Sequence, residues 1–150
     1  MAKISEQIQI RGNKQEIFNL LKGFKSFPAF MYYINSLKVT KHSSTSFISD
    51  WSINIDGVPV RWKEEDLVNE ANFVIEFNMI EGDYAKYKGK WEVLQDSHNA
   101  KIKITVDIDW GAPTFTSFVE VKKILTRKTR KAFKGMLLAI KRKIENKVNL

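Results

Sequence analysis

The residues best suited to chemistry are two carboxylates, Glu64 and Asp66, which follow Val58, Val60 and Trp62 at every second position. In a β-strand this spacing places all five side chains on one face. If the strand continues through both acids, they point inwards, where burial raises a carboxyl pKa and allows proton or hydrogen-bond donation. If the strand ends near Glu64, the acids lie at a wet rim facing Lys or Arg. We leave both positions open for Glu64 and favour the rim for Asp66.

Large aromatic residues fall on the apolar side of the alternating segments. A curved sheet held against one helix leaves space, and bulky apolar linings with few polar groups are typical of small-molecule pockets. Plain core packing is the alternative explanation. Gly89 favours a cavity, because a glycine on the inner face of a strand leaves volume unfilled. The predicted ligand-binding residues are Phe30, Tyr33, Trp51, Trp62, Glu64, Phe77, Tyr87, Trp91, Phe118 and Met136.

Other catalytic chemistries have little support in this sequence. It contains no Cys, which excludes disulfides and thiol nucleophiles, and its two histidines, His42 and His98, lie in polar connections. Asp107 and Asp109 have strand spacing, but they share an outward face with lysines and are expected to pair with lysines across strands. We therefore predict no catalytic residue, no metal site and no cofactor.

Basic residues are concentrated at the C-terminal end. The formal net charge is +8, yet residues 119–150 contain 11 Lys and Arg against 2 acids, and the other residues contain 14 basic and 15 acidic groups. A solvated surface is one explanation, and an anionic membrane or nucleic acid is the functional alternative. Without aromatic residues on the outer helix face, base stacking lacks support, so nucleic acid is the less favoured partner. The predicted basic surface comprises Lys123, Arg127, Arg130 and Lys134.

The elements that must position these residues follow from hydropathy periodicity. Residues 3–11 alternate as a strand, and Asn13 is a helix cap before two short helices. Between residues 37 and 110 the period of two predicts about six strands in an antiparallel meander, with a hairpin turn at 56–57. Apolar positions at three- and four-residue spacing then predict a long amphipathic helix over 115–146.

Length and composition indicate one globular domain over residues 1–150. Hydrophobic residues make up 43% and aromatic residues 12% of the 150 residues. The N-terminal residues lack the apolar stretch of a secretory signal, and no run approaches the roughly 20 apolar residues of a membrane span. We therefore expect a cytoplasmic protein.

The order of strand, two short helices, six-strand meander and long C-terminal helix resembles the helix-grip fold. The chain is similar to the START/Bet v 1-like superfamily, on its polyketide cyclase/dehydrase and coenzyme-Q-binding branch. The segments that carry the resemblance are residues 15–18, 27–30, 60–66, 89–93, 109–113 and 136–137. The resemblance implies an α+β fold in which a curved antiparallel sheet of about seven strands and two short helices wrap around the long helix.

The resemblance also implies a function. It points to a hydrophobic cavity between sheet and helix that binds a lipid-like, polyketide or isoprenoid molecule, with an isoprenoid quinone or similar polycyclic ligand preferred. One alternative is cyclase chemistry, but Asp66 stands where the aromatase/cyclase relatives have an Arg, and Ile34, beside Tyr33, stands near their Tyr. The other alternative is a ribosome- or RNA-associated regulator that uses the basic helix.

Overall fold

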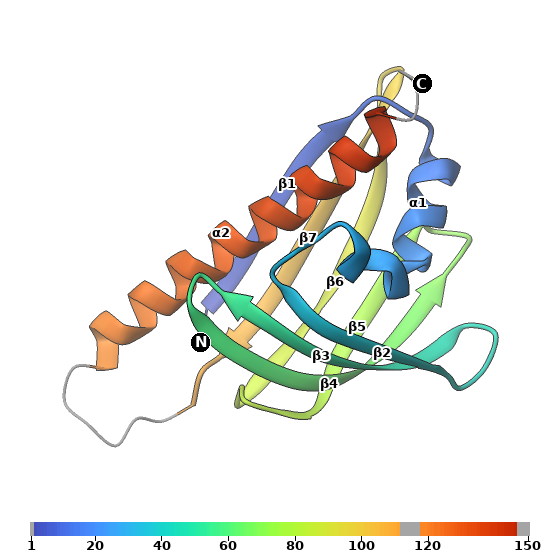
Figure 1. Cartoon of the computed structure of the whole chain (residues 1–150). Helices are drawn as coiled ribbons and strands as arrows, with labels where there is room; N and C mark the ends of the chain where they lie inside the picture. Colours follow the sequence, from blue (N-terminus) through green and yellow to red (C-terminus); the bar gives the residue numbers. More distant parts are fainter. Residues whose placement is uncertain (1, 112–117, 147–150) are drawn as a thin grey trace.

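The computed structural model describes residues 2–111 and 118–146, and its element order is the predicted one (Figure 1). Two short helices separate the first strand from a six-strand meander, and a long helix follows the last strand. The elements are β1 (Ala2–Ile10), α1 (Lys14–Lys22), η1 (Phe24–Ala29), β2 (Ile34–Lys41), β3 (Ser46–Ile55), β4 (Val58–Asn69), β5 (Val74–Gly82), β6 (Lys86–Asp96), β7 (Asn99–Asp109) and α2 (Phe118–Glu145). This arrangement confirms the expected helix-grip fold.

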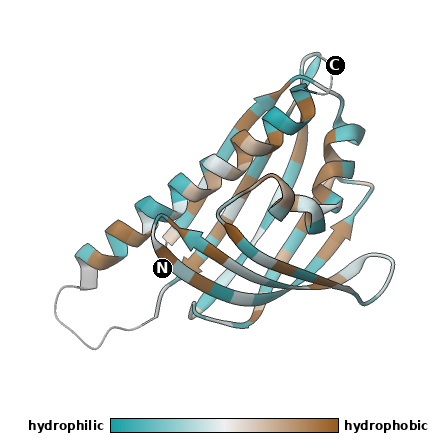
Figure 2. Ribbon diagram, viewed as in Figure 1, coloured by the Kyte–Doolittle hydropathy of each residue, from teal (hydrophilic) through white to brown (hydrophobic). Residues whose placement is uncertain are grey.

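The strands form one antiparallel sheet in the order β1-β7-β6-β5-β4-β3-β2, so the first strand pairs with the last. The sheet curves around α2, and apolar and polar residues alternate along its strands (Figure 2). In β7 the apolar series from Ile102 to Ile108 is buried. Lys88 lies opposite Asp107 on the outward face, as the cross-strand interpretation of that acid requires.

The two short elements after β1 cover part of the concave face that α2 leaves open (Figure 1). The Asn13 side chain caps α1 by accepting a hydrogen bond from the Glu16 backbone N–H at 2.8 Å, as predicted. The helix buries Phe18, and η1 buries Phe24 and Phe27. These rings therefore extend the apolar core beneath the central strands.

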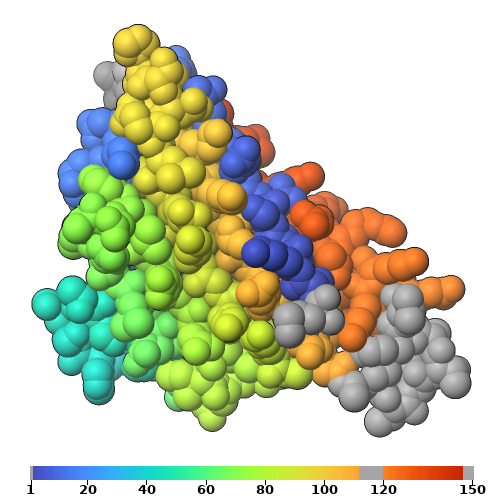
Figure 3. Space-filling view, turned by 180° about the vertical axis from the view of Figure 1, so that it is seen from behind, coloured from blue at the N-terminus to red at the C-terminus, as the bar shows by residue number. Residues whose placement is uncertain are grey.

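The two halves of α2 are packed differently. In the C-terminal half, Phe133, Leu137 and Ile140 are buried, whereas Leu125 in the N-terminal half is only half-buried. Seen from behind, the side chains of α2 extend past the edge of the sheet beside β1 (Figure 3). The C-terminal half thus anchors the helix, and the N-terminal half leaves more of its surface to solvent. Among the described residues, no helix is both long and apolar enough to cross a membrane.

Candidate ligand-binding site

The centre of the candidate site is the pair of acids on β4. Glu64 is 4% and Asp66 is 2% exposed, so both carboxyl groups face the interior. The rim position that we favoured for Asp66 is therefore wrong. The reason is that β4 continues to Asn69 and pairs with both β3 and β5 beyond Glu64, which keeps the inward alternation intact.

A network of hydrogen bonds surrounds the pair. The indole Nε1 of Trp62 donates to Glu64 Oε1 at 2.6 Å. Ser49 Oγ donates to Asp66 Oδ2, and the indole Nε1 of Trp51 donates to Ser49 Oγ at 2.9 Å. The two carboxyl groups lie two positions apart on the same face of β4, and each shifts the pKa of the other. Two buried carboxylates this close repel one another, so the pair favours the protonated state of one acid.

The proton of the pair is best assigned to Glu64. Burial raises the pKa of Glu64 well above its usual 4.5, and Asp66 raises it further. Burial also raises the pKa of Asp66, but hydrogen bonds from Glu64 and Ser49 oppose that shift. Glu64 is therefore the acid of the pair that more readily keeps its proton at a pH where an exposed glutamate has lost it.

Aromatic rings enclose the acids. Phe24 stacks on Trp51 with ring centroids 6.2 Å apart, and Trp51 stacks on Trp62 at 5.5 Å with an interplanar angle of 4°. Tyr87 lies 5.0 Å from the Trp62 ring and 5.3 Å from Phe77. Five predicted site residues, Trp51, Trp62, Glu64, Phe77 and Tyr87, are thus joined in one buried cluster.

The expected open hollow is not present beside the acid pair. The cavity there measures about 10 Å³, which is room for one water molecule at most. It is lined by Leu21, Phe24, Phe27, Trp51, Glu64, Asp66, Ile75 and the predicted Trp91.

The space that Gly89 was expected to leave is also filled. A Cβ atom there would lie 2.0 Å from the Thr105 carbonyl oxygen and 3.0 Å from Phe77 Cζ. Gly89 therefore permits the close approach of β7 and the Phe77 ring, and it does not provide room for a ligand.

The other predicted site residues lie outside this cluster. Phe30 is half-buried and packs against Phe27, and Met136 is buried on α2. Phe118 is the first residue of α2, but its side chain lies outside the described residues. Tyr33 reaches α2, where its hydroxyl is buried without a hydrogen-bond partner within the described part of the chain.

Sequence reasoning missed three contributors to the cluster. Ser49 shares the inward face of β3 with Trp51 and donates the hydrogen bond to Asp66. Phe24 follows the glycine that ends the first helix and stacks in line with the two indoles. Tyr84 lies in the β5–β6 turn and stacks 4.7 Å from Tyr87. A serine on the inward face, two positions before a tryptophan, is the one feature of the sequence that could have indicated this hydrogen-bond donor.

A second concavity lies between α2 and the β3–β4 hairpin, and we call it the hairpin groove. Its volume is about 550 Å³, within the range of small-molecule sites. It is lined by Tyr32, Tyr33, Asn35, Asn54, Asp56, Gly57, Lys131, Ala132 and Gly135. Unlike the acid-centred cavity, this groove has the size of a ligand.

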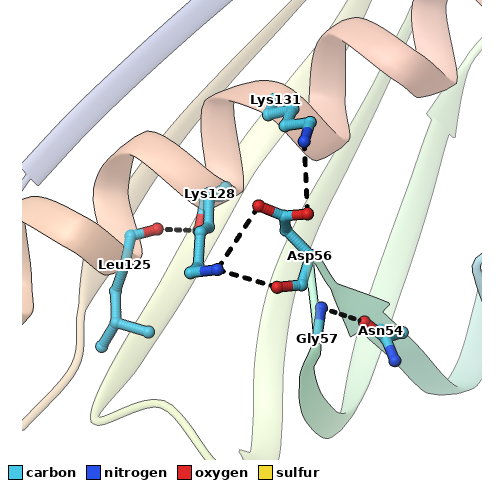
Figure 4. Close-up of polar contacts among 7 residues, drawn as sticks. Asn54, Asp56, Gly57, Leu125, Lys128 and Lys131 are labelled. Carbon is cyan, nitrogen blue, oxygen red and sulfur yellow. Dashed lines mark hydrogen bonds and ion pairs between the residues drawn. The ribbon is translucent and has the colours of Figure 1, made fainter.

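Ion pairs connect the two walls of the hairpin groove (Figure 4). The Asp56 carboxylate accepts hydrogen bonds from Lys131 Nζ at 3.2 Å and from Lys128 Nζ at 3.3 Å. Lys128 also donates to the Asp56 carbonyl oxygen at 2.8 Å. Hydrogen bonds from Lys131 and then Lys128 lower the pKa of Asp56, so the contact persists across the neutral range. Asp56 thus holds the hairpin tip against α2.

The predicted basic surface divides into paired and unpaired cations. Arg130 lies 3.2 Å from Glu6 Oε1 on β1, so its charge is partly neutralised. Lys123, Arg127 and Lys134 are exposed and make no ion pair with the described residues. No group of three His, Cys, Asp or Glu side chains suited to a metal ion occurs in the described parts of the chain.

Solved structures share this architecture over nearly its whole length. The Zhui aromatase/cyclase from Streptomyces sp. R1128 superposes with a TM-score of 0.89 at 12% identity, covering 98% of this chain and 95% of that one. TTHA0849 from Thermus thermophilus gives 0.79 at 21% identity, covering 93% and 97%. A START superfamily protein from Mycobacterium smegmatis gives 0.76 at 11% identity, covering 96% and 97%. At these identities the likeness establishes the fold alone.

The chain thus has the helix-grip fold, which an aromatase/cyclase and a START superfamily protein share. The sequence identifies the family more closely. Residues 13–134 match the family described as polyketide cyclase/dehydrase and lipid transport, and the chain belongs to it. Among curated proteins, none matches this sequence closely enough to count as a relative. Family membership supports the binding of hydrophobic small molecules.

Proposed function

We propose that this protein binds and sequesters a hydrophobic small molecule that carries an oxygen function. The observation that carries the proposal is the buried Glu64–Asp66 pair inside an aromatic interior, where burial favours a protonated carboxyl group. A neutral carboxyl group can donate a hydrogen bond to a carbonyl oxygen without the penalty of an isolated buried charge. Family membership is consistent with a hydrophobic cargo.

Binding requires the interior to open, because the cavity at the acid pair holds one water at most. Removing apolar ligand surface from water contributes about 25 cal/mol per Å², which offsets the rearrangement of side chains. The N-terminal half of α2 is only partly covered, so it is the part of the enclosure whose movement costs the least free energy. We assign the hairpin groove as the route by which the ligand enters.

The geometry of the rings favours a flat ligand. Phe24, Trp51 and Trp62 are nearly parallel, with interplanar angles of 7° and 4°. A planar ring system can insert into or extend such a stack, and a carbonyl on its edge would then meet the Glu64 hydroxyl. Isoprenoid quinones and polycyclic aromatic ketones both have these features, so they are the proposed ligand class.

The test compares a planar quinone with a hydrocarbon of the same shape. We expect 9,10-anthraquinone to quench the tryptophan fluorescence of the wild-type protein saturably. The E64L variant should weaken anthraquinone binding by about tenfold, the equivalent of one buried hydrogen bond, and should leave anthracene binding nearly unchanged. The E65Q variant alters the exposed neighbouring carboxylate on β4 and serves as the control. Equal losses for both ligands in E64L would refute a polar role for Glu64.

The Asp56 contact should control the rate of ligand exchange. The D56N variant removes the charge that holds Lys128 and Lys131, so the hairpin separates from α2 more readily. Exposed ion pairs are weak, and we expect anthraquinone release to become about two- to fivefold faster with little change in stability. Stopped-flow fluorescence measures this rate. The D96N variant, at the end of β6, should release the ligand at the wild-type rate. A wild-type rate for D56N would exclude the hairpin groove as the route.

Acid–base catalysis is the second candidate, and the same carboxyl pair favours it. A protonated Glu64 could donate its proton to a ketone oxygen of a poly-ketone chain, with the indole N–H of Trp62 stabilising the resulting carboxylate. The two candidates differ in the fate of the ligand. A carrier returns it unchanged, whereas a cyclase converts a linear poly-ketone into a ring product. Mass spectrometry of the recovered ligand, with E64Q as the inactive control, separates them.

A further inference from the structure

The outermost line of α2 combines apolar and basic side chains. Ile124, Lys131 and Leu138 are spaced seven residues apart and therefore lie on nearly the same side of the helix. Ile124 is 45% and Leu138 is 38% exposed. Both lie opposite the buried side formed by Phe133 and Ile140. Two large aliphatic side chains thus face solvent on a helix that already has a complete buried side.

Cations flank these aliphatic residues. Arg127 and Lys134 are exposed, lie beside the Ile124–Leu138 line and make no ion pair within the described residues. The Lys131 side chain is 72% exposed even though it contacts Asp56. Glu120, in the first turn of α2, is the acid nearest to this line in the sequence. Arg127 and Lys134 therefore give this face two positive charges that no described acid neutralises.

A third exposed apolar group lies across the hairpin groove. Tyr32 is 94% exposed, the highest value among the large hydrophobic residues described, and it lines the groove opposite Lys131 and Gly135. Its ring contacts Tyr33 at 5.4 Å and otherwise projects into solvent. Tyr32 and Lys131, the middle residue of the Ile124–Leu138 line, thus both border the groove.

We propose that this face docks on an anionic membrane surface. The docking face consists of Tyr32, Ile124, Arg127, Lys131, Lys134 and Leu138. Basic side chains are attracted to anionic headgroups, while exposed aliphatic and tyrosine side chains insert at the boundary between headgroups and acyl chains. A polynucleotide would contact the cations. Ile124 and Leu138 would add nothing to its affinity, because they cannot stack on bases as aromatic residues do. The mixture therefore favours a bilayer over RNA.

The position of the docking face relates membrane contact to ligand exchange. The hairpin groove opens within this face, so a docked molecule would exchange cargo with the bilayer without passing it through water. The inference goes beyond the proposed function, because vesicle binding is measured without cargo. Loss of vesicle binding with intact anthraquinone binding would overturn the docking face alone, and the reverse result would overturn the proposed cargo alone.

Vesicle co-sedimentation of the full chain tests the proposal. We expect binding to phosphatidylcholine vesicles containing about 30% phosphatidylserine and little binding to pure phosphatidylcholine, with a marked decrease at about 0.5 M NaCl. The R127Q/K134Q variant should lower the partition coefficient at least about tenfold. The I124S/L138S variant should lower it by a similar factor, because it removes the inserting groups and leaves the charge unchanged.

The control variant K38Q/K41Q removes two exposed charges from β2 and should bind vesicles as the wild type does. Circular dichroism confirms that each variant is folded. Three results would overturn the proposal. They are absence of binding to the phosphatidylserine vesicles, full binding by I124S/L138S, and single-stranded RNA binding that exceeds vesicle binding and ignores the aliphatic substitutions.

Discussion

Replacing Gly89 with alanine is expected to lower the free energy of unfolding by about 3 kcal/mol or more. The added Cβ atom would lie 2.0 Å from the Thr105 carbonyl oxygen and 2.9 Å from Val106 Cα, both on the backbone of β7. A flexible side chain can move away at low cost, but a paired strand in the middle of the sheet cannot. Urea denaturation followed by far-ultraviolet circular dichroism measures the difference.

The matched control for this substitution is Gly135 on α2. A Cβ atom there meets the Tyr33 ring at 3.6 to 3.8 Å, which is ordinary contact. Because alanine is favoured over glycine within a helix by about 1 kcal/mol, G135A should be neutral or stabilising. If G89A proved as stable as the wild type, the sheet would have room at β6, and the original interpretation of Gly89 as a sign of empty volume would regain support.

The stability of the protein is expected to fall as the pH rises above about 5. A group whose pKa is raised by folding binds more protons in the folded than in the unfolded state, so rising pH favours unfolding through that window. For Glu64 the window begins near its usual pKa of 4.5 and continues to its raised value. The slope is at most about 1.4 kcal/mol per pH unit for one proton. Burial also raises the pKa of Asp66, which acts in the same direction.

The E64Q variant should flatten this slope, because glutamine keeps the size and hydrogen-bonding groups of the side chain but does not titrate. The carboxylates with lowered pKa values, including Asp56 and Glu145, act with the opposite sign, but their effect falls below the usual carboxyl range and leaves the window above pH 5 clear. Urea denaturation at several pH values between 5 and 8 provides the measurement. The E65Q control should retain the wild-type slope, and a retained slope in E64Q would mean that another group binds the proton.

The fold could be predicted because its determinants are local. The two-residue period over β3 to β7, the Asp56–Gly57 turn and the Asn13 cap each depend on neighbours in sequence. Gly57 has a φ of +94°, a backbone conformation that favours glycine, so an Asp-Gly pair marks this turn in the sequence. The aromatic cluster followed from the same alternation, because inward residues of adjacent strands must meet on the concave face.

The state of the acid pair could not be predicted from the alternation alone. Whether Asp66 lies at a rim or in the core depends on how far β5 extends beside β4, which is set by pairing between strands. The raised pKa of Glu64 depends in turn on the dry surroundings that Trp51, Trp62 and Ser49 help to create. Desolvation is a property of the whole enclosure and has no local signature in the chain.

The amino-acid order by itself determined the seven strands, the grip around one long helix, the inward aromatic residues and the basic character of that helix, since these depend on periodicity and composition. Only the tertiary structure decided that the interior beside Glu64 is filled, that Gly89 accommodates neighbouring backbone, and that Ile124 and Leu138 face solvent beside an open groove. Volume and exposure depend on how distant segments pack against one another, and packing is established only when the sheet and the helix come together.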